Sequence, residues 1–179
     1  MRRTFLVSII CLVLPLSQAR ADLFAFDLDA QAGYTQISNV ERPLTPESTT
    51  LSGGTFGVRG KLEILFISLM VDYQHFFNDA DFLHAGLGAD FKLPLGPIEP
   101  FVRGSVGLIM LTAKKGAFDP DAEGKLDATA GFQARLGVGL DIPLGDWFAV
   151  GLSADAGYHY ITGKSGWDIS AMGYLGLRI

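Results

Sequence analysis

The fold of this chain can be read from fifteen residues, ATAGFQARLGVGLDI, which run from Ala128 to Ile142. Apolar side chains occupy every even position, and glycine, polar or charged residues occupy every odd one. Successive side chains of a β-strand point to opposite faces, so this period of two predicts a strand with one apolar and one polar face. The same alternation returns about eight times and ends in an apolar strand, Gly173 to Ile179.

The alternating segments divide the chain into eight expected strands. The connections after the second, fourth and sixth strands are tight turns, whereas Ile37 to Gly54 and Leu111 to Leu126 read as long polar loops. Short turns at one end and longer loops at the other are typical of outer-membrane barrels, whose longer loops face outward. We expect strands at about 23–36, 55–63, 67–76, 83–93, 99–108, 128–142 and 150–160, and an eighth that begins at Trp167.

The first residues have the three parts of a secretory signal peptide. Met1 to Arg3 is basic, Phe5 to Leu16 is apolar, and Ala19-Arg20-Ala21 has the small-x-small pattern of a cleavage site. The apolar run is too short to span a bilayer as a helix, which takes roughly 20 residues. We therefore predict a signal peptide over residues 1–21 and one exported β-barrel domain over residues 22–179.

Composition narrows the class of function. Loss of Arg2, Arg3 and Arg20 with the signal peptide would take the formal net charge from −5 to about −8, which disfavours nucleic acid as a partner. The single cysteine, Cys11, lies within the signal, so disulfides and cysteine catalysis are not expected. Mean hydropathy is +0.30, yet no later stretch is continuously apolar for long enough to form a membrane helix, so the apolar residues must be interleaved.

Alternation alone does not say which face meets lipid, because a soluble lipocalin-like barrel also alternates, with its apolar face inward. Strands of about nine to eleven residues match a tilted bilayer crossing, and aromatic residues gather at the strand ends. Tyrosine and tryptophan favour the headgroup level, where the ring is buried and its polar atom stays hydrated. The same criterion places Phe76, Phe77 and Phe82 at the membrane interface, on the side of the long loops. The predicted membrane-interface residues are Phe24, Tyr34, Tyr73, Phe91, Trp147, Tyr158, Tyr160 and Trp167.

From Asp22 to Ile179 the chain resembles the small eight-stranded outer-membrane barrels, the superfamily of outer-membrane proteins A and X and the opacity-type surface proteins. The marks of the resemblance are the signal peptide, the hairpin KLPLGPIEPF from Lys92 to Phe101, and the alternating last strand. It implies an all-β, eight-stranded, antiparallel up-and-down transmembrane barrel with a polar, largely filled lumen. It also implies outer-membrane lipid and lipopolysaccharide as partners, and assembly machinery that reads the last strand. Those barrels usually end in phenylalanine, and Ile179 departs from that.

An eight-stranded barrel is just wide enough to be filled by its own side chains, so charges on the inward face must pair. Two-residue turns at Leu65-Phe66 and Leu95-Gly96 set the expected register of two hairpins. The expected pairs are Arg59 with Asp72, Lys92 with Glu99, Arg103 with Asp90, Arg135 with Asp155, and Arg178 with Asp27. The whole predicted ion-pair network is Asp27, Asp29, Arg59, Lys61, Asp72, Asp90, Lys92, Glu99, Arg103, Arg135, Asp155 and Arg178.

One group of inward residues invites a test for catalysis. Members of this group share the polar face near the loop end of the last two strands: Ser153, Asp155, His159, Asp168 and Ser170. Outer-membrane lipid A deacylases, which this chain resembles only in barrel size, carry a His-x-Ser motif, whereas here His159 is followed by Tyr160 and Ile161. We therefore expect no catalytic residues, no metal site and no cofactor.

The sequence thus favours a non-enzymatic integral outer-membrane barrel of a Gram-negative bacterium, with a structural or surface-contact role through its extracellular loops. The ligand of those loops is not identified by any motif. Two alternatives stay open from the residues alone. One is a porin-like narrow channel or carrier for small or apolar solutes, and the other is a soluble, lipocalin-like periplasmic binder.

Overall fold

The computed structural model describes residues 24–42, 45–77, 80–113, 127–161 and 163–179. The predicted signal peptide and most of the predicted loop from Leu111 to Leu126 lie outside these ranges. Within the described residues, no helix is long and apolar enough to cross a membrane. The strands are β1 (Phe24–Arg42), β2 (Thr45–Ile64), β3 (Ile67–Phe76), β4 (Ala80–Lys92), β5 (Glu99–Ala113), β6 (Asp127–Leu144), β7 (Phe148–Ile161) and β8 (Lys164–Arg178).

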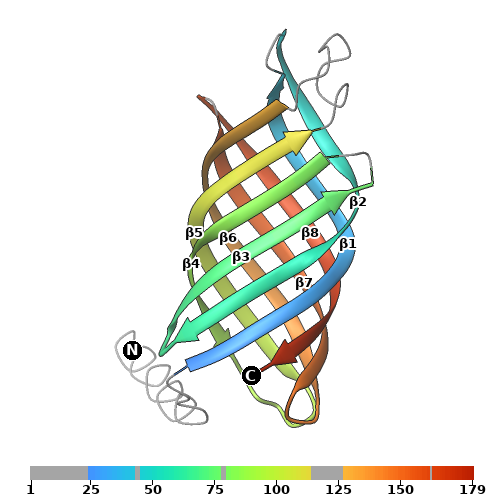
Figure 1. Cartoon of the computed structure of the whole chain (residues 1–179), viewed down its shortest axis with the longest axis vertical. Helices are drawn as coiled ribbons and strands as arrows, with labels where there is room; N and C mark the ends of the chain where they lie inside the picture. The colour runs from blue at the N-terminus through green and yellow to red at the C-terminus, as the bar shows by residue number, and fades with distance from the viewer. Residues whose placement is uncertain (1–23, 43–44, 78–79, 114–126, 162) are drawn as a thin grey trace, which may run out of the picture.

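The eight strands form a closed barrel in sequence order, which confirms the predicted fold class. Each strand is antiparallel to its neighbours, and β8 returns to pair with β1 from Asp27↔Arg178 to Ile37↔Asp168. Beyond that ladder, Phe26 and Ile179 exchange two backbone hydrogen bonds of 2.8 and 2.9 Å. In Figure 1 the strands are strongly tilted, and β1 begins and β8 ends at the end of the barrel that carries the tight turns.

The tight turns fix the register of the hairpins. Ile64 pairs with Ile67 around Leu65 and Phe66, as the sequence predicts. In the β4–β5 hairpin the predicted turn is wrong, because Leu95 bridges to Ile98 and the central residues are therefore Gly96 and Pro97. Gly96 has a φ of 76°, a left-handed conformation that glycine adopts without steric cost. The register of this hairpin consequently differs from the predicted one by two residues.

The sequence pattern predicted a polar loop from residue 37 to 54, and this prediction is wrong. β1 continues to Arg42 and β2 begins at Thr45, and the two strands pair as far as Arg42↔Thr45 across two irregularities in the register. β8 stops pairing with β1 at Ile37, and β3 starts pairing with β2 at Thr55. The far parts of β1 and β2 therefore form a two-stranded ribbon that extends past the other strands, as Figure 1 shows.

The outer surface of the barrel is apolar. Its strands present large apolar side chains at alternate positions, among them Leu136 at 70%, Leu152 at 65% and Val106 at 62% exposure. The polar and charged positions of the same strands face the lumen and are buried. A lipocalin-like barrel would have the reverse arrangement, so the apolar outer wall argues against the soluble alternative.

The lumen is not polar along its whole length. At the loop end it is filled by buried apolar side chains, which we name the outer apolar cluster. Phe76 and Phe82 belong to it and are fully buried. The prediction that they lie at the membrane interface is therefore wrong, although they are at the loop end. Phe76 shares its face with Gln74 and Phe82 shares its face with His84, and both of those polar residues point inward. The cluster consists of Ile37, Leu51, Phe76, Ala80, Phe82, Ile109, Leu111 and Ile161.

Candidate functional site: the charged lumen

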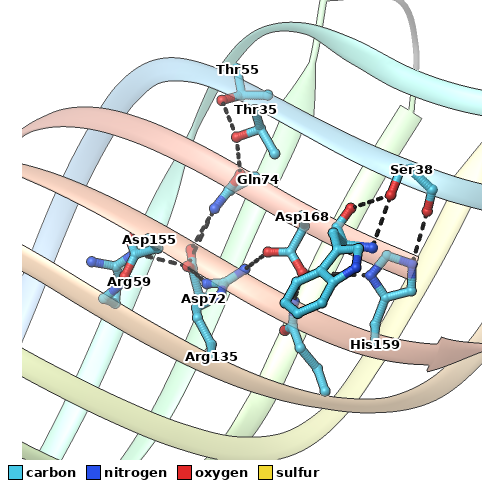
Figure 2. A network of polar contacts seen from close by, with 12 residues as sticks. Thr35, Ser38, Thr55, Arg59, Asp72, Gln74, Arg135, Asp155, His159 and Asp168 are labelled. Atoms are coloured by element: carbon cyan, nitrogen blue, oxygen red, sulfur yellow. Dashed lines mark hydrogen bonds and ion pairs between the residues drawn. The ribbon is translucent and has the colours of Figure 1, made fainter. Parts of the chain in front are cut away.

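Asp72 of β3 is the centre of the polar network below the outer apolar cluster. Its carboxylate accepts hydrogen bonds from Nη2 of Arg59 at 2.9 Å and from Nη1 of Arg135 at 2.7 Å. Nε2 of Gln31 donates to the same group at 2.5 Å, and Nε2 of Gln74 donates at 3.3 Å. Figure 2 shows Arg59, Gln74 and Arg135 gathered around Asp72. One fully buried carboxylate thus joins β1, β2, β3 and β6 across the lumen.

Two further carboxylates complete this central layer. Asp155 receives a bidentate pair of hydrogen bonds from Arg103, at 2.8 Å from Nε and 2.6 Å from Nη2, and lies 3.6 Å from Nη2 of Arg59. Asp168 accepts from Nε2 of Gln133 at 2.5 Å and lies 3.7 Å from Nη2 of Arg135. Three arginines therefore face three aspartates, so the formal charges of this layer balance, as buried ions require.

A second charged layer fills the turn end of the lumen. Nζ of Lys61 lies 2.9 Å from Asp27 and 2.8 Å from Asp90, and Nζ of Lys92 lies 2.9 Å from Asp141. Beside these pairs is a cavity of about 20 Å³, which is close to the smallest space that holds one water molecule. The lumen is consequently packed with paired side chains.

The structure contains the predicted pair of Arg59 with Asp72, but two other cations bind carboxylates that differ from the predicted ones. Lys92 pairs with Asp141, because the β4–β5 register sets Lys92 opposite Phe101 and not opposite Glu99. Among the described residues, Glu99 takes part in no ion pair. Arg103 stands opposite Asp90 in the ladder and nevertheless binds Asp155. Its side chain reaches Asp155 of β7 over Gly137 of β6, which lies between the two residues in the ladders.

The other two predicted pairs are also altered. Arg135 binds Asp72 and not Asp155, which lies opposite Gly137. Arg178 stands opposite Asp27, as expected, but its closest carboxylate oxygen belongs to Asp29 at 2.5 Å, with Asp27 at 3.7 Å. Asp29 was in the predicted network without a partner. The sequence therefore predicts which charged residues belong to the network better than it predicts which of them pair with each other.

Several members of the network are missing from the sequence prediction. Tyr174 donates its hydroxyl to Asp141, and Gln31, Gln74, Gln133 and Asp168 bind the central ions. All of these side chains occupy inward positions of the predicted strands. The predicted network contained only charged residues, so the neutral donors were left out, and Asp168 was considered only in the group tested for catalysis.

The inward glycines leave room for the network, and Gly137 does so most directly. A Cβ atom at this position would overlap Oδ1 of Asp155 and come within 2.9 Å of Nε of Arg103. Gly137→Ala should therefore disturb this ion pair and destabilise the barrel by about 1–3 kcal/mol, as overpacking does. The matched control is Gly60→Ala, because a Cβ atom there meets nothing within 4 Å. Urea unfolding of both variants in vesicles measures the difference, and equal stability would contradict the packing role of Gly137.

His159 and its neighbours do not form a nucleophile and base pair. His159 is fully buried, and its Nε2 lies 3.0 Å from the backbone oxygen of Ser38, while its Nδ1 lies 3.5 Å from Asp168 (Figure 2). Within the described residues, no hydrogen bond joins His159 to Ser153 or Ser170. The described residues also contain no group of histidine, cysteine and acidic side chains arranged to hold a metal ion.

The aromatic residues predicted for the membrane interface all lie on the outer surface. Their exposure ranges from 41% for Tyr73 to 63% for Trp167. Tyr158 and Trp167 pack edge to face, with ring centroids 5.0 Å apart. Phe24, Phe91 and Trp147 lie toward the turn end, and the others, Tyr34, Tyr73, Tyr158, Tyr160 and Trp167, lie toward the loop end. Their contact with lipid headgroups stays a prediction.

Comparison with solved structures supports the fold. No protein-family model and no curated protein matches the sequence. Among solved structures, Neisserial surface protein A is similar over 87% of this chain and 97% of its own, with 14% identity and a TM-score of 0.59. The N-terminal β-barrel domain of Pseudomonas aeruginosa OprF is similar over the same shares, with 14% identity and a TM-score of 0.53. The chain has the fold of the small eight-stranded outer-membrane barrels.

Proposed function

We propose that this protein is an integral, non-enzymatic barrel of the bacterial outer membrane that makes contacts at the cell surface through its loop end. The apolar outer wall and the ion pairs of the lumen support a membrane location, because the apolar face then meets lipid and the charged face is kept away from it. The predicted signal peptide agrees with export. The lumen, filled by ion pairs, serves as a scaffold that holds the loop end in place.

The observation that carries the surface role is the ribbon formed by β1 and β2 beyond Ile37 and Thr55. Ser38 still contacts Trp167 and His159, and Gly54 still accepts a hydrogen bond from the backbone N–H of Phe77. Beyond these two residues, the described parts of β1 and β2 pair in the sheet only with each other, so each has a free edge. An edge strand offers unpaired backbone N–H and C=O groups, to which an extended segment of another protein can add as a further strand. The partner we propose is therefore a protein that presents such a segment.

Electrophoresis tests the membrane barrel. Folded protein in detergent should migrate faster without boiling than after boiling, because the closed barrel resists unfolding by the detergent. Fractionation should recover the protein with membranes and only detergent should extract it, since the outer wall is apolar. A protein that enters aqueous buffer without detergent and shows no change in mobility on boiling would refute the proposal and favour the soluble binder.

Replacement of residues 40–49 by an Asn-Gly turn tests the surface role. This change removes most of the ribbon and leaves the ladders of β1 with β8 and of β2 with β3 intact. The shortened protein should retain its heat-dependent mobility, and cells that display it should lose adhesion to protein-coated surfaces. Cells that display the intact protein and cells without it are the two controls. Equal adhesion by intact and shortened proteins would rule out the ribbon as the contact.

A channel is the weaker candidate. It would need a continuous path, whereas the charged layers are paired across the lumen and the cavity beside them is about 20 Å³. Purified protein in planar lipid bilayers should therefore carry no steady ionic current. Such a current in the unmodified protein would restore the channel as the leading function.

A further inference from the structure

The two kinds of lumen filling meet along a defined boundary. The guanidinium carbon of Arg135 lies 5.1 Å from the centre of the Phe82 ring, so this cation of the central layer touches the outer apolar cluster. On the turn side of this contact most of the buried side chains are ions, amides and hydroxyls, with Met70, Phe101 and Met172 among them, and on the loop side the lumen is filled by the cluster. The contact separates two layers with opposite affinity for water.

The outer apolar cluster spans the lumen from many sides. Its members come from the loop ends of β1, β2, β3, β4, β5 and β7, and none is more than 5% exposed. An ion that enters such a layer loses its hydration and gains no polar partner, which is very costly. Narrow apolar constrictions close channels in this way, by excluding water.

The central layer has different chemistry. Among the described residues, both ring nitrogens of the fully buried His84 and the hydroxyls of Ser153 and Ser170 have no hydrogen-bond partner in the protein. Buried polar groups of this kind are usually satisfied by ordered water. This layer can therefore be wetted whenever its ion pairs separate, which the apolar layer above it cannot.

We propose that the outer apolar cluster is a second seal of the barrel, in series with the ion-pair network, so that opening the network alone leaves the barrel closed to ions. The inference concerns permeability and does not depend on the surface contact proposed above. It assigns the barrier at the loop end to packing between Phe76, Phe82 and their neighbours, and not to charge.

Single-channel recording in planar bilayers tests the two seals separately. The network variant carries Arg103→Ser and Asp155→Ser, which removes both partners of a buried pair and so avoids an uncompensated charge. We expect this variant to stay silent. Addition of Phe82→Ser should produce steady ionic currents, because the loss of Arg103, which lines the cavity at the turn end, extends this cavity into the central layer, and the serine admits water to the cluster. Phe82→Ser alone should be silent, since the network remains in place.

The matched control adds Phe77→Ser to the network variant. Phe77 follows Phe76 in the sequence but is 74% exposed and lies outside the cluster, so this variant should be silent. Heat-dependent mobility verifies folding of every variant. Should Phe82→Ser prevent folding, Ile161→Thr in the same background takes its place, because it adds a hydroxyl to the cluster and keeps most of the side-chain volume.

Three results would overturn the proposal. Currents through the network variant alone would show that the cluster does not seal. Currents through Phe82→Ser alone would show that the network is not a second barrier. Silence of the folded combined variant, with Phe82→Ser or Ile161→Thr, would show that the barrier at the loop end does not reside in the cluster.

Discussion

Asp72→Ala should destabilise the barrel by about 3–5 kcal/mol, the usual cost of removing one partner from a buried ion pair. The aspartate is fully buried and binds two arginines, Arg59 and Arg135, as well as two glutamines. Its loss removes the carboxylate that both buried arginines bind, and alanine cannot accept any of the lost hydrogen bonds. The unfolding midpoint in urea, followed in lipid vesicles by heat-dependent mobility, measures the loss.

Glu99→Ala is the matched control, because it also removes a carboxylate from a strand but breaks no ion pair among the described residues. Its unfolding midpoint should stay near that of the unmodified protein. Asp72→Asn should fall between the two, since the amide keeps the size of the side chain and one acceptor oxygen. If Asp72→Ala and Glu99→Ala unfold at the same urea concentration, Asp72 is not the centre of the network.

Leu136→Arg should cost about 2–4 kcal/mol if the barrel is embedded in a bilayer, because an arginine on the lipid face near the midplane must be desolvated. Leu136 lies in the middle of β6, on the outer wall, and is 70% exposed. In a soluble barrel the same substitution of an exposed side chain would change stability by no more than about 0.5 kcal/mol. Unfolding in vesicles therefore separates the two locations of the protein.

Leu144→Arg provides the depth control. Leu144 is the last residue of β6, beside the turn, and is half exposed on the same wall. Close to the membrane interface an arginine reaches the headgroups, and the cost falls to about 0–1 kcal/mol. A bilayer thus predicts a large loss at Leu136 and a small one at Leu144. Small losses at both positions would mean that lipid does not surround the strands.

The barrel was predictable from sequence because period-two alternation is a local property. β3 has the bounds that its alternation predicts, 67–76, and the Arg59 and Asp72 pair follows from the two-residue turn that joins β2 to β3. The ribbon was missed because its residues do not alternate clearly. β1 and β2 are extended there by pairing with each other, although their sequence has no apolar face that would predict a strand.

The partners within the lumen could not be predicted in the same way. Arg103 does not pair with its ladder neighbour Asp90 but binds Asp155, two strands away, because Gly137 between them has no side chain to keep them apart. Phe82 illustrates a different limit. Its position near a strand end suggested the membrane interface, whereas its parity with His84 already assigned it to the lumen. For aromatic residues at strand ends, parity is the better guide.

The seam between β8 and β1 has a consequence for how the chain folds. Arg178 and Asp29 meet across this seam although they are 149 positions apart in the sequence. Every other ladder joins strands that follow one another, so hairpins can form locally, but the seam requires the whole sheet to curl first. We therefore expect closure to be the slow, late event of folding. Until it occurs, β1 and β8 each present an open edge, and the aspartates and arginines of the lumen are not yet shielded from water.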